Sequence, residues 1–396
     1  MGKRKLLVFA STFPRWKDDT NPPFVYELSK RLTKDFDVSV LAPNYPGAKQ
    51  DEVMDKMKVH RFNYFIKRYQ TLAGSGGILP TLKKNKWFYF QIPFFIIAEF
   101  FALRKQIKNN KPDVIHAHWI IPQGFVSYLN YKINKTPYVI TTHGGDIFGL
   151  QGKLLTYLKK ITLKDSKKIT VVSNAIKKEI LTKIDSNLKI EVIPMGVDTK
   201  LFNPNKKDNS IKKRYNINGS FLLFVGRLTE KKGVKYLIDA MPNIIKEYPE
   251  AKLMIIGSGE LEKELKQQVK NLNINRSVIF MGAIKNSDIS RYYATADIFV
   301  GPSIKAKDGD MEGLGLTFVE AGLSGCNLVG SNVGGILDVI NKNDGFLTKE
   351  KDSKDISNKI IKLIKNPVKD KNKIRDELIK RFDLEIIGKE YGSLLE

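Results

Sequence analysis

Short runs of apolar residues alternate with helical stretches, and this alternation constrains the fold more than any other feature of the chain. In the first half the runs occupy residues 6–10, 38–41, 113–116, 138–141, 168–172 and 190–193. Between the first two runs, Phe24, Leu28 and Leu32 recur at helical spacing. Uninterrupted apolar runs of this length are typical of strands buried on both faces. The alternation therefore predicts an open parallel sheet with helices on both faces.

The alternation stops near the middle of the chain and then starts again. Residues 193–204 form a polar, proline-containing connection, and further apolar runs follow at 221–225, 252–256, 278–280, 298–300 and 327–329. The tail over 354–396 is charged and helical in pattern. A length of 396 residues fits two or three domains at about 150 residues each. We predict one α/β domain over 1–200, a second over 201–375 and a terminal helix over 376–396.

The composition narrows the class of protein. With 67 Lys and Arg against 42 Asp and Glu, the net charge is +25, which fits nucleic acid, an anionic membrane, a phosphorylated substrate or a solvated basic surface. A hydrophobic fraction of 42% excludes a disordered chain. A single cysteine, Cys326, excludes a disulfide framework and a cysteine-based zinc site, and it fits a reducing cytoplasm. Nucleic acid has charge as its only support, because no helix-turn-helix, zinc-finger or RNP pattern is present.

Residues 87–103 form an apolar stretch crowded with phenylalanine. As a helix it would reach about 26 Å, short of the ~30 Å hydrocarbon core, and Pro93 and Glu99 interrupt it, so we do not expect a transmembrane anchor. Basic residues flank it at Lys83, Lys84, Lys86, Arg104, Lys105 and Lys108. Two interpretations remain open: a helix lying on an anionic membrane surface, or a buried helix of the first domain.

The motif with the clearest chemistry begins at Glu312 and ends at Glu320. Gly313 and Gly315 lie at the entrance of an apolar helix, where free backbone N–H groups favour a diphosphate. If both carboxylates were on the helix they would be about 12 Å apart, too far for a retaining glycosidase pair at about 5 Å. That spacing matches a long ligand held at both ends. The alternative is a capped helix with surface charge.

A second motif follows the apolar run at 221–225. Arg227 and Lys232 come at the carboxyl end of this predicted strand, where open parallel sheets bind ligands, and both reach far enough to contact a phosphate. The alternative is a solvated basic turn. Gly257-Ser258-Gly259 begins like a dinucleotide fingerprint, but Glu262 occupies its sixth position, which excludes the dehydrogenase pattern.

The four histidines divide by their context. His60 has no motif around it and is expected to be structural. His116 and His118 lie in a strand-like run, and we expect them to face opposite sides, to chelate no metal and to serve in packing or acceptor contacts. His143 precedes Gly144-Gly145-Asp146, a context that favours a site residue over a core residue.

Taken together, these motifs resemble the retaining glycosyltransferases of family 4. The resemblance extends over nearly the whole chain. In the second half it is carried by Glu312 and Glu320, Gly226-Arg227-Leu228 with Lys232-Gly233, the run from Ala296 to Ser303, and Gly334-Gly335 with Asp338. In the first half it is carried by Phe13-Pro14-Arg15-Trp16, the run from Asp113 to Trp119, Thr142 to Asp146, Val172-Ser173-Asn174 and Gly196-Val197-Asp198.

The resemblance implies the GT-B fold, in which two Rossmann-like domains face each other across a cleft and the last helix crosses back to the first domain. It implies transfer of a hexose, with retention, from a UDP- or GDP-linked sugar to a lipid-linked or polysaccharide acceptor. No metal ion and no cofactor are expected beyond the donor itself. The expected location is the cytoplasm, with peripheral attachment to the inner face of the membrane through 87–103 and its basic flanks.

The resemblance also assigns roles to particular residues. Arg227 and Lys232 would hold the diphosphate, together with the backbone of Gly313, Leu314 and Gly315. Glu312 would bind sugar hydroxyls and support positive charge near the anomeric carbon, and Glu320 would bind the ribose. His143 would approach the sugar from the first domain, with Asp146 and His118 on the acceptor or sugar side. Many members carry a glycine pair after the first strand, but here that loop reads Thr20-Asn21-Pro22-Pro23-Phe24, so no phosphate contact is expected there.

Three alternatives to a glycosyltransferase are considered: another enzyme on the same fold, a nucleic-acid-binding protein and a non-catalytic relative. A nucleotide-sugar epimerase on the same fold would isomerise the donor and form no glycosylated product. A basic nucleic-acid-binding protein would bind DNA in a salt-sensitive way and would not bind nucleoside diphosphates. A relative that binds sugars without catalysis is disfavoured by the complete motif set.

Overall fold

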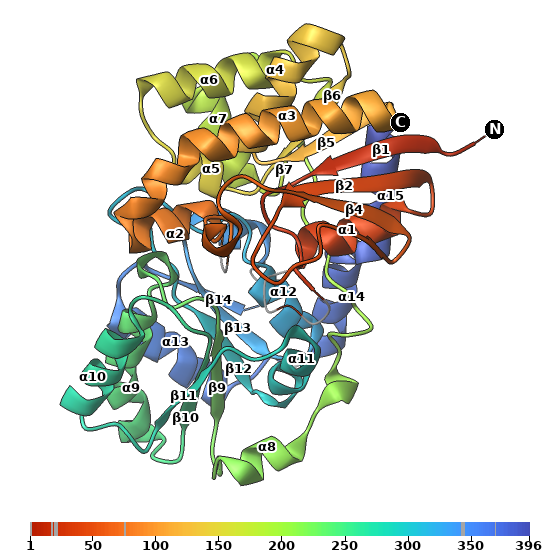
Figure 1. Cartoon of the computed structure of the whole chain (residues 1–396). Coiled ribbons are helices and arrows are strands. Elements are labelled where there is room, and N and C mark those ends of the chain that lie inside the picture. Colours follow the sequence, from red (N-terminus) through yellow and green to blue (C-terminus); the bar gives the residue numbers. More distant parts are fainter. Residues whose placement is uncertain (1, 17–18, 20–22, 75–76, 342–344, 369) are drawn as a thin grey trace. The chain divides into compact units, whose positions relative to one another are not determined.

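The chain folds into two compact units, each built on its own sheet. The computed structural model describes residues 2–16, 19, 23–74, 77–341, 345–368 and 370–396 (Figure 1). Unit 1 comprises residues 1–196 and 384–396, and unit 2 comprises residues 197–383. Two units with parallel sheets are what the repeated alternation of apolar runs predicts.

Unit 1 contains an eight-stranded sheet in the order β3-β4-β2-β1-β5-β6-β7-β8. Its strands are β1 (Arg4–Phe9), β2 (Phe36–Pro43), β3 (Asp51–Met54), β4 (Met57–Phe62), β5 (Val114–His118), β6 (Tyr138–Thr142), β7 (Lys168–Val171) and β8 (Glu191–Val192). All neighbours pair in parallel except β3 and β4. The strand order reverses between β1 and β5, the kind of position where such sheets bind ligands.

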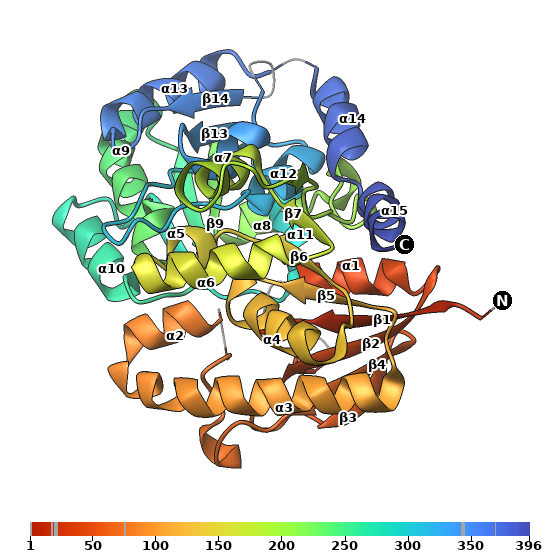
Figure 2. The same cartoon turned by 90° about the horizontal axis from the view of Figure 1, so that it is seen from above.

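Helices cover both faces of this sheet. They are α1 (Phe24–Leu32), α2 (Ile78–Lys84), α3 (Ile92–Asn110), α4 (Phe125–Asn134), α5 (Gly145–Phe148), α6 (Lys153–Lys164), α7 (Asn174–Lys183) and α15 (Leu384–Leu395), with short helical turns η1 (Lys67–Tyr69), η2 (Lys86–Gln91) and η3 (Ile120–Gly124). On one side α3 packs against α4, and on the other α1 packs against α15 (Figure 2). Leu28 and Leu32 on α1 are buried, as their helical spacing predicts.

Unit 2 contains a six-stranded, wholly parallel sheet in the order β11-β10-β9-β12-β13-β14. Its strands are β9 (Phe221–Val225), β10 (Lys252–Ile256), β11 (Val278–Gly282), β12 (Ile298–Gly301), β13 (Asn327–Ser331) and β14 (Gly345–Thr348). Here the strand order reverses between β9 and β12. The loops after these two strands therefore begin at the ligand-binding edge of the sheet.

The helices of unit 2 complete its core. They are α8 (Asn209–Arg214), α9 (Val234–Glu247), α10 (Glu262–Asn271), α11 (Asn286–Thr295), α12 (Leu316–Leu323), α13 (Ser353–Lys365) and α14 (Lys371–Phe382), with short turns η4 (Pro204–Lys206), η5 (Glu230–Lys232) and η6 (Gly334–Asp338). Helices α9, α10 and α13 pack over one face of the sheet around Leu237 and Leu253, which are fully buried. Helices α11 and α12 lie on the other face (Figure 1).

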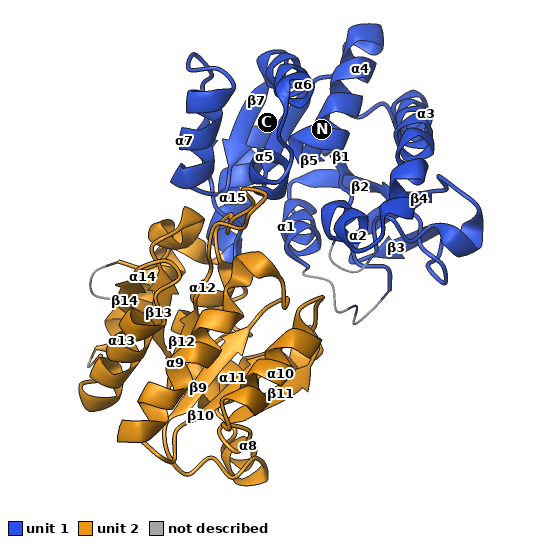
Figure 3. Cartoon of the chain, turned by 90° about the vertical axis from the view of Figure 1, so that its left-hand side faces the viewer, with its two compact units in different colours: residues 1–196, 384–396 blue, residues 197–383 orange. Residues whose placement is uncertain are grey.

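The chain crosses between the units twice, at Gly196/Val197 and at Asp383/Leu384 (Figure 3). Within unit 2 the two crossings are joined, because Val197 N donates to Phe382 O at 2.8 Å. The crossings lie at positions 196 and 383, against predicted boundaries of 200 and 375. Residues 376–383 group with unit 2, since α14 packs on α12.

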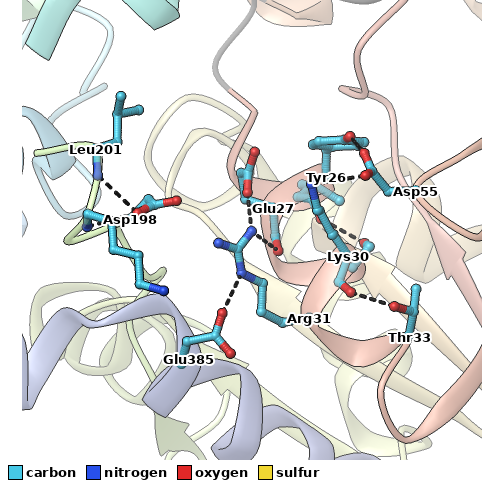
Figure 4. Close-up of polar contacts among 12 residues, drawn as sticks. Tyr26, Glu27, Lys30, Arg31, Thr33, Asp55, Asp198, Leu201 and Glu385 are labelled. Carbon is cyan, nitrogen blue, oxygen red and sulfur yellow. Dashed lines mark hydrogen bonds and ion pairs between the residues drawn. The ribbon is translucent and has the colours of Figure 1, made fainter.

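The last helix, α15, belongs to unit 1. Its buried face carries Leu384, Ile387, Tyr391, Leu394 and Leu395. Ion pairs stabilise its first turn, because Glu385 accepts from Arg31 Nε at 3.2 Å (Figure 4) and also pairs with Lys34. Arg31 also pairs with Glu27 one turn earlier in α1. The sequence therefore returns to its starting unit in its final 13 residues.

Every apolar run named from the sequence is a strand, but three strands escape that pattern. β3 and β4 form an antiparallel hairpin, and β14 is an edge strand. The residues of β3 and β14 are mostly exposed or only partly buried, and in the interior strand β4 the apolar residues are interrupted by Lys58, His60 and Arg61. Edge strands need no continuous apolar run, because one side of the strand faces solvent.

Candidate active site

The residues predicted to bind the donor gather at one edge of the unit 2 sheet. Gly226 and Arg227 follow β9, Gly301 ends β12, and Gly334 follows β13. Parallel strands end at the same edge, so these loops lie together beside the β9/β12 reversal. Backbone contacts join them: Ile304 N donates to Lys231 O at 2.8 Å, and Gly335 N donates to Glu312 O at 3.0 Å.

Two largely buried ion pairs lie in these loops. Lys232 pairs with Glu312, and Lys231 pairs with Asp310 at 3.1 Å. The side chains of Lys232 and Glu312 are only 15% and 14% exposed. Burial acts to raise the pKa of Glu312, but Lys232 and Lys231 outweigh it and the pKa is lowered. Glu312 is therefore a carboxylate at neutral pH, held directly beside two ammonium groups.

Glycines allow the loops to approach this closely. A Cβ at Gly335 would lie 2.1 Å from Gly313 O, and one at Gly233 would lie 1.9 Å from Pro302 O. Gly233 also has φ +62°, a left-handed conformation that disfavours other residues. The glycines at 233 and 335 are thus required by backbone contact, which explains motifs that the sequence presents only as patterns.

Glu312 and Glu320 lie on different kinds of structure. Helix α12 begins at Leu316 with Gly315 as its N-cap at φ +87°, so Glu320 is on the helix and Glu312 is in the loop before it. The 12 Å separation expected for two helical positions therefore does not apply. Gly313, Leu314 and Gly315 are buried at the helix entrance, where the first backbone N–H groups have no helical partners.

Glu320 is held by a tyrosine that the sequence does not single out. Tyr293 on α11 donates its hydroxyl hydrogen to Glu320 Oε2 at 2.8 Å. Burial raises the pKa of Glu320 to about 7, although the Tyr293 hydrogen bond opposes this. Tyr293 itself is fully buried, and Cys326 Sγ donates to its carbonyl at 2.9 Å. No local motif marks Tyr293, because it reaches Glu320 through tertiary packing.

In unit 1 the three histidines of β5 and the β6 loop form one cluster. His118 Nδ1 lies 2.9 Å from His143 Nε2, and the ring centroids of His116 and His118 are 4.2 Å apart. The expectation that His116 and His118 face opposite sides is wrong. Side chains alternate along a strand with a period of two, so residues i and i+2 share a face.

Asp146 lies in the core rather than on an open surface. Its two oxygens accept hydrogen bonds from Ile120 N and Thr142 Oγ1, both at 2.6 Å. Its side chain is buried, and burial raises its pKa. The carboxyl group thus ties the turn after His143 to η3. Asp146 therefore has a supporting position in the turn that follows His143, and His143 itself is only half-buried.

The loop whose sequence departs from the glycine pair includes residues 20–22, which lie outside the described residues. Within the described ranges, no group of three or more His, Cys, Asp or Glu side chains is arranged to hold a metal ion.

Each half of the chain matches a family model of glycosyltransferases. Residues 23–201 match Glycosyltransferase Family 4, and residues 205–381 match Glycosyl transferases group 1. With its two parallel-sheet domains, the chain belongs to the family 4 glycosyltransferases of the GT-B fold and is a glycosyltransferase. The family resemblance inferred from the motifs is confirmed.

Relatives support the same family. A glycosyltransferase of Methanocaldococcus jannaschii is 31% identical over 58% of this chain, and the match spans 60% of that protein. The N-acetyl-alpha-D-glucosaminyl L-malate synthase of Bacillus anthracis is 27% identical over 78% of this chain and 81% of its own length. A GDP-mannose-dependent phosphatidylinositol monomannoside mannosyltransferase of Corynebacterium glutamicum is 28% identical, covering 68% and 71%.

Solved structures show the same fold. The sucrose-phosphate synthase of Thermosynechococcus elongatus has a TM-score of 0.80 at 18% identity, covering 99% of this chain and 98% of that one. HepE of Anabaena in complex with UDP has a TM-score of 0.75 at 18% identity, covering 99% of both chains.

Proposed function

We propose that this enzyme moves a hexose from a UDP- or GDP-linked sugar to a lipid-linked or polysaccharide acceptor, with retention and without a metal ion. Unit 2 binds the donor. The observation that supports this most directly is the buried Lys232–Glu312 pair beside the entrance of α12. It combines a cation for phosphate and a carboxylate for sugar in one place, which a solvated basic turn or a capped surface helix would not do.

The proposed chemistry follows from the charges in these loops. Lys232 and Arg227, with the backbone N–H groups from Gly313 to Gly315, neutralise the diphosphate as it leaves, which is the task a metal ion performs elsewhere. The bond from the anomeric carbon to the diphosphate breaks, and its electron pair goes to the phosphate. The acceptor oxygen forms a new bond on the same face and its proton passes to the leaving phosphate. Glu312 supports the positive charge on the sugar, and His143 of unit 1 contacts the sugar.

The donor is tested by binding and by product analysis. Thermal shift against UDP-, GDP-, ADP- and dTDP-sugars identifies the base, because a ligand that binds only the native state raises its stability. Lys232→Ala should weaken binding of the matching nucleoside diphosphate by about tenfold or more. Lys235→Ala, an exposed lysine of α9, is the matched control. Equal affinity in both variants would place the phosphate elsewhere.

The alternative on the same fold is separated by its products. Incubation with labelled nucleotide sugar should yield free nucleoside diphosphate and a glycosylated acceptor. An isomerised nucleotide sugar without glycosylated product would instead show an epimerase.

We also propose that the acceptor is reached from an anionic membrane surface, on the cytoplasmic side. Helix α3 has two apolar faces. Phe95, Glu99 and Leu103 are buried within unit 1, whereas Phe94, Ile97 and Phe101 are exposed. The two interpretations left open by the sequence thus describe opposite faces of one helix. Within the described chain, η2 and α3 together form a helical stretch long and apolar enough to span a membrane, yet one side of it is packed against α4.

The exposed face continues onto neighbouring turns. Phe65 contacts Trp87, Phe90 and Phe94 with ring centroids 5.5 to 6.3 Å apart, and Tyr69 contacts Trp87 at 6.2 Å. We call this the aromatic surface; its exposed members are Ile66, Tyr69, Trp87, Tyr89, Phe90, Phe94, Ile97 and Phe101. Glu99 is the only acidic residue over 86–110 and it is buried, so the exposed charges of this stretch are basic. Aromatic residues with a basic border suit an anionic interface.

Vesicle binding tests the aromatic surface. Phe94→Ser with Phe101→Ser should lower binding to vesicles containing phosphatidylglycerol at least about tenfold. Each aromatic ring that enters the membrane interface adds up to about 3 kcal/mol to the free energy of binding. Val53→Ser with Leu337→Ser, two exposed apolar residues elsewhere, is the matched control. Equal loss in both pairs, or binding unchanged by the phenylalanine substitutions, would contradict the proposal.

A further inference from the structure

Two histidines of unit 1 contact each other directly. His118 ends β5 and His143 follows β6, the adjacent parallel strand. Their Nδ1 and Nε2 atoms are 2.9 Å apart, and the rings are inclined by only 19°. His118 is fully buried, whereas His143 keeps part of its surface exposed. The buried ring of His118 is therefore hydrogen-bonded to the ring of His143, which contacts the sugar in the proposed function.

Both rings are neutral at pH 7, which limits how the contact is made. Burial lowers the pKa of His143 to about 3 and the pKa of His118 well below its ordinary value. A neutral imidazole carries one N–H. If His118 Nδ1 holds the shared hydrogen, His143 has its own proton on Nδ1. If His143 Nε2 holds it, His143 Nδ1 is a bare acceptor.

The surroundings of His118 decide between these arrangements. His118 Nε2 is buried without a hydrogen-bond partner in the described part of the chain. A proton on Nε2 would leave a buried donor unmet, whereas a proton on Nδ1 leaves only a lone pair unmet. Unmet buried donors are the rarer case in native proteins. The proton therefore belongs on His118 Nδ1, facing His143.

We propose that His118 is a positioning residue that donates from Nδ1 to His143 Nε2 and holds His143 as the Nδ1–H tautomer. His143 then offers a hydrogen-bond donor, which matches the oxygen of a sugar hydroxyl. The role at the sugar rests on the proposed function, but the tautomer does not. Free histidine prefers the Nε2–H form, so the neighbouring ring imposes the opposite choice.

Nitrogen NMR of the intact protein tests the tautomer. With ¹⁵N-labelled histidine, only four side chains contribute signals, and the His143 signals are assigned by their loss in His143→Asn. We expect His143 to show a protonated Nδ1 and an unprotonated Nε2. His118→Asn, whose amide N–H can replace the Nδ1 donor, should keep this pattern, and His118→Phe should return His143 to the Nε2–H form. A protonated Nε2 in the unmodified protein overturns the proposal, even if His118→Phe does not fold.

Kinetics separates the positioning role from the proposed function. His118→Phe should lower kcat for transfer at least about tenfold, whereas donor affinity changes little because the donor binds unit 2. His118→Asn should restore most of kcat, and His60→Asn is the control for loss of a histidine. If His118→Asn fails as badly as His118→Phe while folded, the proposal is wrong. If the unmodified protein binds no nucleotide sugar, the proposed function is wrong and the NMR result still stands.

Discussion

At the scale of single residues, neighbours set the charge state of the site. Glu312 and Glu320 are carboxyl groups eight positions apart, yet their pKa values move in opposite directions. Lysines beside Glu312 lower its pKa despite burial, whereas Glu320 has one tyrosine hydrogen bond and its pKa rises to about 7. One residue is thus fixed as a carboxylate, and the other titrates near neutral pH.

Glu312→Gln separates binding from catalysis. The glutamine cannot support positive charge on the sugar, so we expect transfer to fall at least about 100-fold. Donor affinity should stay equal or rise, because the carboxylate no longer competes with the diphosphate for Lys232. Turnover and calorimetric binding measure the two effects, with Glu264→Gln, at an exposed position of α10, as control. Near-normal turnover would contradict the assigned role.

The pKa of Glu320 predicts pH-dependent donor binding. The charged form accepts ribose hydroxyl hydrogens better than the protonated form, so affinity for a nucleotide sugar should fall toward tenfold per pH unit below about 7. A nucleotide sugar is the right probe because its diphosphate does not titrate there. Tyr293→Phe removes a hydrogen bond that lowers the pKa of Glu320, so the midpoint of the change in affinity with pH should move to higher pH. Affinity that is constant from pH 5.5 to 8 would exclude this role.

At the scale of elements, helix α3 shows how one sequence stretch serves two environments. The stretch is apolar all round, so its periodicity does not identify a buried face. Packing against α4, β2 and β4 selects the side with Phe95 and Leu103. Glu99 is buried beside Gln123 of η3, whose Nε2 donates to Glu99 Oε1 at 2.7 Å. Burial raises the pKa of Glu99 to about 8.

Glu99→Gln should change how stability depends on pH. The folded state keeps the Glu99 proton up to about pH 8, whereas the unfolded chain loses it near 4.5. The stabilising contribution is therefore complete below 4.5 and is lost as the pH rises to 8, by up to about 1.4 kcal/mol per pH unit. Urea unfolding should show Glu99→Gln to be more stable than the parent near pH 8 and the difference to shrink toward pH 4.5. Parallel pH profiles would contradict the buried, protonated state.

At the scale of the whole molecule, the chain ends in the unit where it began. The buried face of α15 packs on α1, although more than 350 residues separate Arg31 from Glu385. Contacts between segments so distant in sequence close a long loop, so unit 1 cannot be completed before unit 2 has been synthesised.

Shortening the buried side chains of α15 should destabilise unit 1 selectively. Ile387→Ala with Leu394→Ala removes two buried side chains, at a cost of about 2 kcal/mol or more each. The three tryptophans, Trp16, Trp87 and Trp119, all lie in unit 1, so fluorescence reports that unit alone. The fluorescence transition should move to lower temperature. Lys389→Ala with Glu390→Ala, on the exposed face, should leave it unchanged. A shift of equal size in both pairs would contradict the selective role of the buried face.

The sequence by itself determined the local structure and the type of chemistry. Runs such as 221–225 form strands because uninterrupted apolar residues need burial on both faces, and the glycines around Glu312 and Gly335 mark close backbone approach. The family and the loops proposed to bind the donor follow from these local patterns. The hairpin of β3 and β4 did not, because the edge strand β3 carries no continuous apolar signal and polar residues interrupt the apolar ones in β4.

Only the tertiary structure decided which groups meet. Tyr293 reaches Glu320 from another helix, His118 meets His143 across two strands, and Asp146 is buried where the sequence placed it near the acceptor. The aromatic surface is exposed because the rest of unit 1 covers only one side of α3. These outcomes depend on which elements pack together, and spacing along one chain carries no record of distances between separate elements.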